Sequence, residues 1–216
     1  MLSLRGSATS EADSNYDYDY NIVMEKPKKI KLVFGVGNPG AEYEGTRHNF
    51  GLDLVRHQLE AERAFPFGTY GKRDRLTLAS ANTFVNESGK AVKALQQLVK
   101  CKPEEILVVH DEADLPLLWL KLSFARSAAG HKGVESIIGA LKTDKFWRLR
   151  LGIQGTPGQD PRRIKRKQAM DIILKKLRGP ELDAWKKARR RFGQILDRLG
   201  QVSPDKLNFP QQFLLE

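Results

Sequence analysis

The fold is decided by one stretch near the N-terminus, Ile30-Lys-Leu-Val-Phe-Gly-Val36, which leads directly into Gly37-Asn-Pro-Gly40. A short run of apolar and β-branched residues that stops at glycine and proline predicts a strand followed by a tight turn. The segments that follow decide which kind of sheet this strand belongs to.

Strands and helices alternate along the rest of the chain. Apolar spacing predicts strands at residues 76–79, 106–109, 119–124 and 149–153, and helices at residues 49–64, 88–100, 132–141 and, broken at Gly179-Pro180, from Pro161 onward. This alternation predicts an α/β fold, a single domain with a mixed, mostly parallel, twisted sheet flanked by helices. Functional side chains should then gather at the carboxyl ends of the strands.

The domain is expected to lie between two tails of the 216-residue chain. Residues 1–29 are polar, contain the repeat Tyr16-Asp-Tyr-Asp-Tyr20 and lack apolar periodicity, so we expect them to be disordered. The domain is assigned to residues 30–200, and a C-terminal tail to residues 201–216. The acidic residues of the N-terminal tail argue against a transit peptide, which leaves the mitochondrion and the cytoplasm both open.

Positive charge is concentrated in the C-terminal quarter. The net charge is +11, and the window from Arg162 to Arg191 alone holds thirteen Lys/Arg against three Asp/Glu. Such a surplus favours a phosphate-rich partner such as RNA, although a solvated helix face would explain the same window. No run of about 18 apolar residues occurs, so no membrane partner is expected.

One motif near the N-terminus suggests a different function. Gly35-Val-Gly-Asn-Pro-Gly40 matches the G-x-G-x-x-G pattern of dinucleotide-binding folds, and Glu60 lies about twenty residues further on. That pattern needs its last glycine to open a helix whose N-terminus holds the pyrophosphate. Pro39 and the polar residues 42–48 delay the helix here, so nicotinamide or flavin binding is disfavoured.

The histidines and the single cysteine exclude several kinds of site. His48, His57, His110 and His131 show no zinc-ligand spacing, and Cys101 has no second cysteine to pair with. No G-x-S-x-G nucleophile motif is present. We therefore expect neither a metal ion nor an organic cofactor.

A set of polar residues stands at the ends of the predicted strands. They are Asn38, Tyr43, Arg47, His48, Asn49, Asn86, Asp111, Asp114, His131 and Lys132. Singly, each has an ordinary structural explanation; Asn86, for example, suits the cap of the helix that begins near Ser88. Together they predict a polar site at one edge of the sheet.

Four blocks of sequence occur in an order and spacing typical of a known family. They are residues 32–51, 83–90, 110–116 and 148–153. The first is the most specific, because it combines the Gly37-Asn-Pro-Gly40 turn, Tyr43 and the segment Thr46-Arg-His-Asn49. Over about residues 30–195 the chain resembles the bacterial-type peptidyl-tRNA hydrolases, and this implies their version of the α/β fold.

The resemblance implies an activity and the residues that perform it. The family cleaves the ester between peptide and tRNA, and His48 stands where its water-activating histidine does, with Asp111 in place of the aspartate that orients the imidazole. Ester hydrolysis needs one general base, and histidine titrates near neutral pH. Substrate contacts are implied for cleft residues at the matching positions, Asn38, Tyr43, Asn86, His131 and Lys132.

The resemblance also implies how tRNA is held. Lys121 and Arg150 match basic residues that clamp a tRNA phosphate, and Arg126 is a candidate for part of the same clamp. The implied partners are tRNA and, as a further possibility, the ribosome, and the implied assembly is a monomer.

The match fails in four places. Lys132 stands where the family has an asparagine, Ser123 replaces a basic clamp residue, and residues 116–119 and 125–129 depart from the bacterial pattern. A lysine only donates, so Lys132 cannot accept a hydrogen bond from a water molecule. The departures and the added acidic tail suggest a eukaryotic protein. They leave two hypotheses, an active hydrolase and a non-catalytic RNA-binding or ribosome-associated relative.

Overall fold

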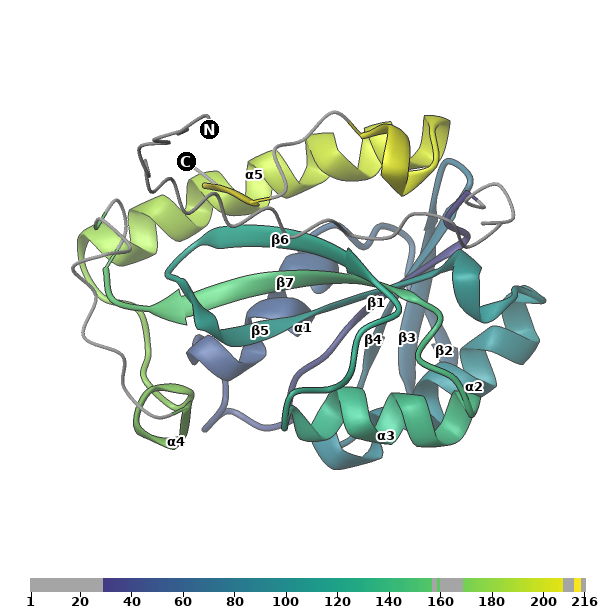
Figure 1. Ribbon diagram of the computed structural model, residues 1–216, viewed down its shortest axis with the longest axis horizontal. Helices are drawn as coiled ribbons and strands as arrows, with labels where there is room; N and C mark the ends of the chain where they lie inside the picture. The colour runs from purple at the N-terminus through teal and green to yellow at the C-terminus, as the bar shows by residue number, and fades with distance from the viewer. Residues whose placement is uncertain (1–28, 157–158, 160–168, 208–211, 215–216) are drawn as a thin grey trace, which may run out of the picture.

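The computed structural model describes residues 29–156, 159, 169–207 and 212–214, and its centre is one eight-stranded sheet (Figure 1). The strands, in their order across the sheet, are β2 (Arg63–Phe65), β3 (Gly68–Arg73), β4 (Leu76–Ala81), β1 (Leu32–Gly35), β5 (Ile106–Pro116), β7 (Trp147–Gln154), β6 (Trp119–Phe124) and β8 (Gln212–Leu214).

The centre of the sheet is parallel and its edges are antiparallel. β4, β1, β5 and β7 run in the same direction, whereas β3 and β2 on one side and β6 and β8 on the other alternate in direction. The predicted mixed α/β sheet is therefore confirmed, and its parallel part is the four-stranded centre. Strand β8 lies within the segment predicted as a C-terminal tail. Residues 1–28 of the predicted N-terminal tail lie outside the described residues.

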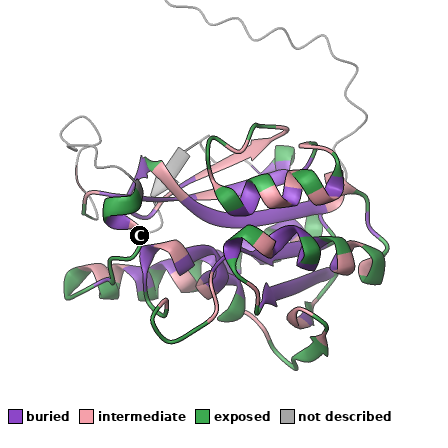
Figure 2. Ribbon diagram, turned by 90° about the horizontal axis from the view of Figure 1, so that it is seen from below, coloured by how far each residue is buried: buried purple, intermediate pink, exposed green. Residues whose placement is uncertain are grey.

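Helices cover both faces of the sheet. On one face lie α1 (Phe50–Arg56) and α5 (Pro180–Gln201), and on the other lie α2 (Ser88–Val99) and α3 (Lys132–Leu141). In Figure 2 the strands are largely buried, while the helices turn exposed residues outward. No helix within the described part of the chain is long and apolar enough to cross a membrane.

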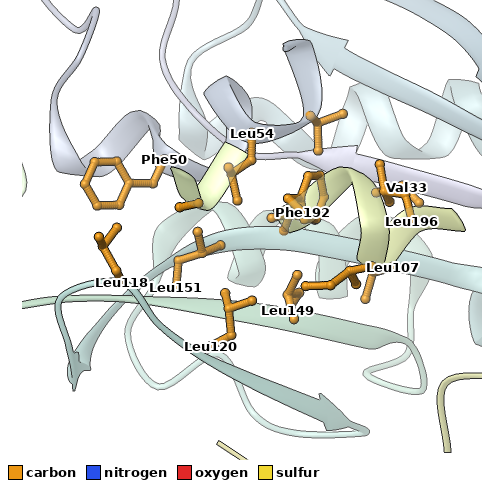
Figure 3. Close-up of a cluster of buried hydrophobic side chains, with 14 of the residues drawn as sticks. Val33, Phe50, Leu54, Leu107, Leu118, Leu120, Leu149, Leu151, Phe192 and Leu196 are labelled. Carbon is orange, nitrogen blue, oxygen red and sulfur yellow. The ribbon is translucent and has the colours of Figure 1, made fainter. Parts of the chain in front are cut away.

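The core between α1, α5 and the sheet is built from alternating strand residues. Leu107 of β5 and Leu149 of β7 point to the same face and pack with Phe50 of α1 and Phe192 of α5 (Figure 3). Successive strand residues point to opposite faces, so Val108 joins the other core, beneath α2 and α3. Both faces of the central strands are thus buried, as a parallel sheet requires.

The start of α1 lies directly on the central strands, at a position where only glycine fits. A Cβ atom on Gly51 would stand 2.1 Å from the carbonyl oxygen of Val109, and one on Gly35 would stand 2.5 Å from the carbonyl oxygen of Gly51. Any side chain here would push α1 off the sheet, together with the loop that precedes it.

The predicted helix at residues 49–64 is wrong beyond Arg56. The helix ends there, Ala61 has a positive φ of 49°, and β2 and β3 form a hairpin instead. Leu59 continues the apolar helical spacing, but it packs on the core from outside any helix. The spacing alone did not distinguish a buried loop residue from a fourth helical contact.

Strand β5 is longer than the four residues predicted for it. It reaches Pro116, so Asp111 and Asp114 lie within the strand and not after it, with an irregular register between Glu112 and Pro116. The predicted basic helices begin outside the described residues, at 160–168; α4 (Ala169–Ile172) follows, and α5 starts at Pro180, next to the predicted break. The carboxyl end of β5 is therefore an ordered scaffold for polar side chains.

Candidate active site

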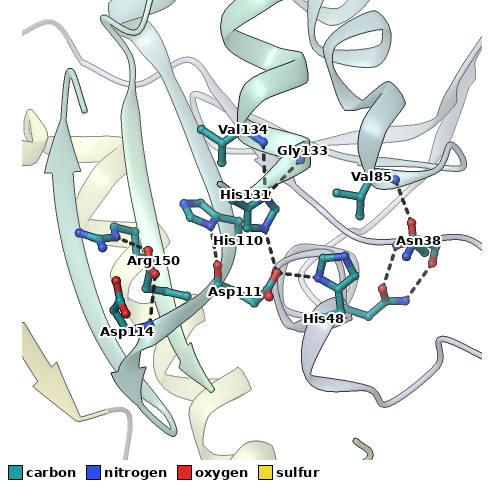
Figure 4. A network of polar contacts seen from close by, with 12 residues as sticks. Asn38, His48, Val85, His110, Asp111, Asp114, His131, Gly133, Val134 and Arg150 are labelled. Atoms are coloured by element: carbon teal, nitrogen blue, oxygen red, sulfur yellow. Dashed lines mark hydrogen bonds and ion pairs between the residues drawn. The ribbon is translucent and has the colours of Figure 1, made fainter. Parts of the chain in front are cut away.

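Two histidines converge on one carboxylate oxygen at the carboxyl ends of the central strands (Figure 4). His48 Nδ1 and His131 Nε2 each lie 3.0 Å from Asp111 Oδ1. His48 comes from the short helix η1 (Arg47–Asn49), Asp111 from β5 and His131 from the N-cap of α3. The structure thus brings the predicted pair together and adds His131 to it.

The hydrogen bonds of His131 fix its tautomer. Its Nδ1 accepts from the main-chain N–H groups of Gly133 at 3.2 Å and Val134 at 3.4 Å, which caps the first turn of α3. A ring nitrogen that accepts carries no proton, so Nε2 carries it and donates to Asp111. The helix therefore holds His131 in place as a donor.

The hydrogen bond of His48 leaves its other ring nitrogen available. Since Asp111 Oδ1 accepts, Nδ1 carries the proton and Nε2 has an unused lone pair, with no hydrogen bond to the described residues. Burial lowers the pKa of His48, but the hydrogen bond and the charge of Asp111 outweigh burial and leave that pKa above its ordinary value of 6.5. His48 Nε2 is therefore a stronger base than the nitrogen of an ordinary histidine.

Asp111 remains an anion between the two histidine rings. Burial raises the pKa of Asp111, yet the charge and hydrogen bond of His131 and the bond from His48 outweigh it and hold the pKa well below its usual range. The preceding residue, His110, donates from Nδ1 to the Asp111 carbonyl at 2.6 Å and meets His131 edge-on at 4.7 Å. Burial, aided by His131, lowers the pKa of His110 well below 6.5 and keeps it neutral.

The loop that carries His48, residues 43–49, is bound to the segment that follows α4. The main-chain N–H groups of Arg47 and His48 donate to the carbonyl groups of Lys175 at 3.0 Å and Ile173 at 2.8 Å. These bonds resemble a short antiparallel pairing, which restrains the backbone of η1. The position of His48 thus depends on a part of the chain far away in sequence.

The Arg47 side chain secures the same loop to the sheet and to α5. Its buried guanidinium donates from Nη1 to the carbonyl of Ile153 at 2.6 Å and to that of Gly155 at 3.3 Å. From Nη2 it donates to Glu181, in the first turn of α5, at 3.0 Å. One side chain therefore links the residue beside the base to two other elements.

Hydrogen bonds fix the orientation of Asn38 and leave its side-chain Nδ2 available as a donor. Its main-chain N–H donates to Asn49 Oδ1 at 2.8 Å, its carbonyl accepts from Asn49 Nδ2 at 2.9 Å, and its Oδ1 accepts from the Val85 N–H at 2.8 Å. With Oδ1 engaged, Nδ2 is fixed in orientation and makes no hydrogen bond to the described residues. Figure 4 places Asn38 beyond His48, on the side away from Arg150.

Two aromatic rings stand near this amide. Tyr43 meets Phe84 edge-on, with ring centroids 6.5 Å apart, and Phe84 is 50% exposed. Asn86 lies two residues further on, exposed in the short helix η2 (Val85–Glu87). Tyr43, through its contact with Phe84, and Asn86 are thus attached to the segment whose Val85 N–H holds Asn38.

The predicted phosphate clamp lies on the opposite side of the cluster. Lys121 of β6 and Arg150 of β7 are direct neighbours across the sheet. Arg150 Nε donates to Glu112 Oε2 at 2.7 Å, so a carboxylate already occupies part of its guanidinium. Arg126 is exposed in the loop after β6. The three predicted cations are near one another, but the guanidinium of Arg150 is already paired with Glu112.

Arg148 is a member of this group that sequence reasoning missed. It is 2% exposed, has no hydrogen bond to the described residues, and lies opposite Ser123, whose hydroxyl is buried without a partner. Burial and the nearby Arg150 lower the pKa of Arg148 to about 10. Its alternation with Leu149 and its place two residues before Arg150 were the available signals. A buried cation without a hydrogen-bonded anion suits an incoming phosphate.

Comparison with known proteins decides the family. A family model described as peptidyl-tRNA hydrolase matches residues 32–208. The chain belongs to the peptidyl-tRNA hydrolase family. It is 40% identical over 160 residues to the peptidyl-tRNA hydrolase of Persephonella marina (70% of this chain, 81% of that one) and 40% identical over 178 residues to that of Neisseria meningitidis (73% and 92%).

Solved structures of the family have the same fold. A crystal structure of the peptidyl-tRNA hydrolase from Acinetobacter baumannii is similar with a TM-score of 0.61 at 28% identity, covering 81% of this chain and 95% of that one. The predicted resemblance and the predicted class of enzyme are thereby confirmed. The chain is a hydrolase of this family, whose name gives peptidyl-tRNA as the substrate.

The residue that departs most visibly from the peptidyl-tRNA hydrolase pattern points into solvent. Lys132 pairs with Glu135 at 3.0 Å along the first turn of α3, and its side chain is 74% exposed. It makes no hydrogen bond with His48, Asp111 or His131. Its predicted substrate contact would therefore require the side chain to leave this weak surface pair.

The three residues of the cluster also have the composition of a metal site. The ligand atoms of His48, Asp111 and His131 all lie within 4.8 Å of one another. A metal on His131 Nε2 would force the ring proton onto Nδ1, which faces the N–H groups of Gly133 and Val134. The donor set therefore fits a proton-transfer site better than a metal ion in this hydrolase.

Proposed function

We propose that the protein hydrolyses the ester between the peptide and the terminal ribose of peptidyl-tRNA, with His48 as the general base. The observation that carries this proposal is the hydrogen bond from His48 Nδ1 to Asp111 Oδ1 at 3.0 Å. That bond fixes the tautomer, so Nε2 can take a proton. Simple binding of RNA would not need an oriented, unprotonated imidazole.

In the proposed reaction, His48 Nε2 removes a proton from a water molecule as the oxygen attacks the ester carbonyl. The imidazolium that forms is stabilised by the Asp111 anion. The tetrahedral intermediate then expels the ribose oxygen, which takes the proton back from His48. Free tRNA and the peptide carboxylic acid are the products, the acid loses its proton to solvent, and the base is regenerated.

The fixed amide of Asn38 supports the charge that develops on the carbonyl oxygen. Its Nδ2 is a donor whose orientation is set before the substrate arrives, because Oδ1 is held by Val85. Donors arranged in advance in this way lower the barrier most where negative charge appears only in the transition state. Asn86 and Tyr43 lie close by and are assigned to the binding of the substrate ends.

The basic groups of β6 and β7 are assigned to the tRNA. Lys121, Arg148 and Arg150 lie on one side of the cluster, and α5 carries further exposed cations. Phosphate contacts release counterions, so binding should weaken steeply with salt. We also propose that the protein acts as a monomer and meets its substrate at stalled ribosomes.

A second function keeps the fold and the tRNA but not the reaction. Lys132 replaces an asparagine of the family pattern, and the basic C-terminal region favours an RNA-binding relative. The retained His48, Asp111 and Asn38 favour the enzyme, because a binder has no use for a base held by a carboxylate.

The test is the release of the blocked amino acid from an N-acetylated aminoacyl-tRNA. Wild type should release it, and His48→Ala should not. His57→Ala is the matched control, because His57 is exposed at the end of α1, outside the cluster, and this variant should keep full activity. Lys132→Asn should equal or exceed wild type, since asparagine can also accept from water.

Two results would reject the enzyme. One is no release by wild type while tRNA still binds in a salt-sensitive way, which would establish the RNA-binding alternative. The other is release that persists in His48→Ala, which would assign the reaction to a different group or to a contaminant.

A further inference from the structure

A pocket of about 430 Å³ lies at the carboxyl end of β4, outside the catalytic cluster. Arg56 at the end of α1, the turn between β2 and β3, and the chain that leaves β4 form its walls. Gly68, the first residue of β3, has a φ of +152°, and a Cβ atom there would stand 2.2 Å from the Ser80 carbonyl oxygen. The backbone packing itself therefore builds the pocket.

The polar groups of this pocket are suited to donating hydrogen bonds. Arg56 has no ion pair among the described residues, and the hydroxyls of Thr69 and Ser80 lie 3.3 Å apart. The Thr83 hydroxyl is buried and lacks a hydrogen-bond partner. None of the described lining residues is acidic, and Phe67 is among the apolar ones. The complementary ligand has an acceptor or an anion on a short apolar stem.

The pocket lies next to the segment that holds the fixed amide. Thr83 is followed by Phe84, which meets Tyr43, and by Val85, whose N–H donates to Asn38. Strand β4 runs parallel to β1, so its carboxyl end lies at the same edge of the sheet as Asn38. A chain bound at Asn38 can reach the pocket without crossing the sheet.

The clamp and the pocket lie on opposite sides of the catalytic residues. In the strand order β3-β4-β1-β5-β7-β6, the clamp is on β7 and β6, the pocket is on β3 and β4, and β1 and β5 lie between them. Figure 4 shows Arg150 on one side of Asp111 and His48, and Asn38 with Val85 on the other. If the tRNA phosphate lies at Arg150, the peptide leaves the ester toward β4.

We infer that this pocket binds an acidic side chain of the peptide, one or two residues before the ester, and gives the enzyme a preference among nascent chains. The inference rests on the proposed function. The Arg56 guanidinium pairs with the carboxylate, and the Thr83 hydroxyl donates to it. The tRNA end, which every substrate shares, lies on the other side.

The test compares substrates that differ in one side chain. Short N-acetylated peptidyl-tRNAs carry glutamate, glutamine or lysine at the second or the third residue from the ester, on one tRNA and with one C-terminal amino acid. We expect kcat/KM for glutamate to exceed that for lysine by about fivefold at one of the two positions, the ratio that a partly exposed ion pair supports. Arg56→Glu should reverse this order.

Two further variants make the test specific. Arg75→Glu makes the same charge change at the turn between β3 and β4, the far end of β4 from Ser80, and should keep the preference of wild type. Thr83→Val removes only the unpaired hydroxyl and should reduce the preference for glutamate. All variants should hydrolyse an N-acetylated aminoacyl-tRNA at the wild-type rate, because that substrate has no second or third residue to place a side chain in the pocket.

The possible failures are distinguishable. No preference at either position, or a preference unchanged in Arg56→Glu, overturns the inference and leaves the hydrolase intact. An equal loss on every substrate in Arg56→Glu would assign the pocket to the common tRNA end and also overturn it. A wild type that hydrolyses none of the substrates would reject the proposed function, and this inference with it.

Discussion

Arg47 and Glu181 form an ion pair at 3.0 Å, although they are 134 positions apart in the sequence. Arg47 is 9% and Glu181 20% exposed at the side chain, so the pair is largely shielded from water. It joins the residue before the catalytic histidine to the first turn of α5. The position of His48 therefore depends on how α5 packs against the rest of the domain.

Arg47→Ala should lower both stability and turnover. The change leaves the carbonyls of Ile153 and Gly155 without their donor, and hydrogen bonds to a charged group are worth about 1.5–3 kcal/mol each. A base displaced by about 1 Å loses roughly a hundredfold in rate. Glu181→Gln keeps the carbonyl bonds and should have a smaller effect. Chemical denaturation and kcat measure the two losses; an unchanged kcat in Arg47→Ala would show that His48 is positioned without it.

Asp111→Asn should shift the pH profile and not only reduce the rate. In wild type, kcat/KM should rise with pH through the elevated pKa of His48, with a midpoint above 6.5. Without the carboxylate, the effect of burial is unopposed and the pKa of His48 should fall below 6.5. The plateau should also drop by about 10²–10⁴, the usual contribution of a general base. A profile that keeps its midpoint in the variant would mean that another group titrates.

His131 has two roles that two substitutions can separate. His131→Asn keeps an acceptor for the first N–H groups of α3, whereas His131→Ala removes it and should cost about 1 kcal/mol more in unfolding free energy. Both lose the imidazole N–H that donates to Asp111, so the charge of Asp111 acts more fully on His48, and the kcat/KM midpoint should move to higher pH in both. A midpoint unchanged in both variants would limit His131 to capping the helix.

Local sequence patterns predicted the elements that are built from local contacts. Residues 119–124 alternate between core and polar side chains, and this pattern gave β6 its observed ends. Residues 132–141 match α3 in the same way, since one apolar face and a capping side chain define it. The helix prediction at residues 57–64 failed because packing against β4 favours a hairpin there, and no local pattern carries that information.

In the candidate site, too, some features follow from local sequence and others from tertiary packing. The residues at the strand ends could be named from the sequence, because parallel strands present their carboxyl ends at one edge. That His48 and His131 share one oxygen of Asp111 depends on how α3 and η1 dock on β5. The role of Arg148 depends on the register of β6 and β7, which places it opposite Ser123. Residue spacing along the sequence does not predict helix docking or strand register of this kind.

Binding of tRNA should respond in opposite directions to two substitutions at one ion pair. Arg150→Gln removes a cation and should weaken binding and reduce the salt dependence by about one phosphate contact. Glu112→Gln releases the Arg150 guanidinium, held now at 2.7 Å, and should tighten binding by about fivefold. Fluorescence anisotropy at several salt concentrations measures both, with Lys93→Gln on the exposed face of α2 as the charge control. Tightening would be absent if no phosphate reaches Arg150.

Titration of His110 should make the folded protein less stable as the pH falls. Its folded-state pKa lies well below 6.5, first because of burial and next because of the adjacent His131. In the unfolded chain the same ring takes up a proton near pH 6.5. The unfolded state therefore binds more protons as the pH falls, and His110 destabilises the fold by about 1.4 kcal/mol between pH 7.5 and 5.5.

His110→Gln removes this titration and keeps an amide that can donate to the Asp111 carbonyl. Wild type should lose about 1.4 kcal/mol relative to the variant on going from pH 7.5 to 5.5, as measured by urea unfolding at each pH. The comparison cancels the other groups, including His48, whose raised pKa acts in the opposite direction and favours the fold at low pH. A difference that stays constant with pH would mean that His110 takes up a proton in the folded protein as readily as in the unfolded chain.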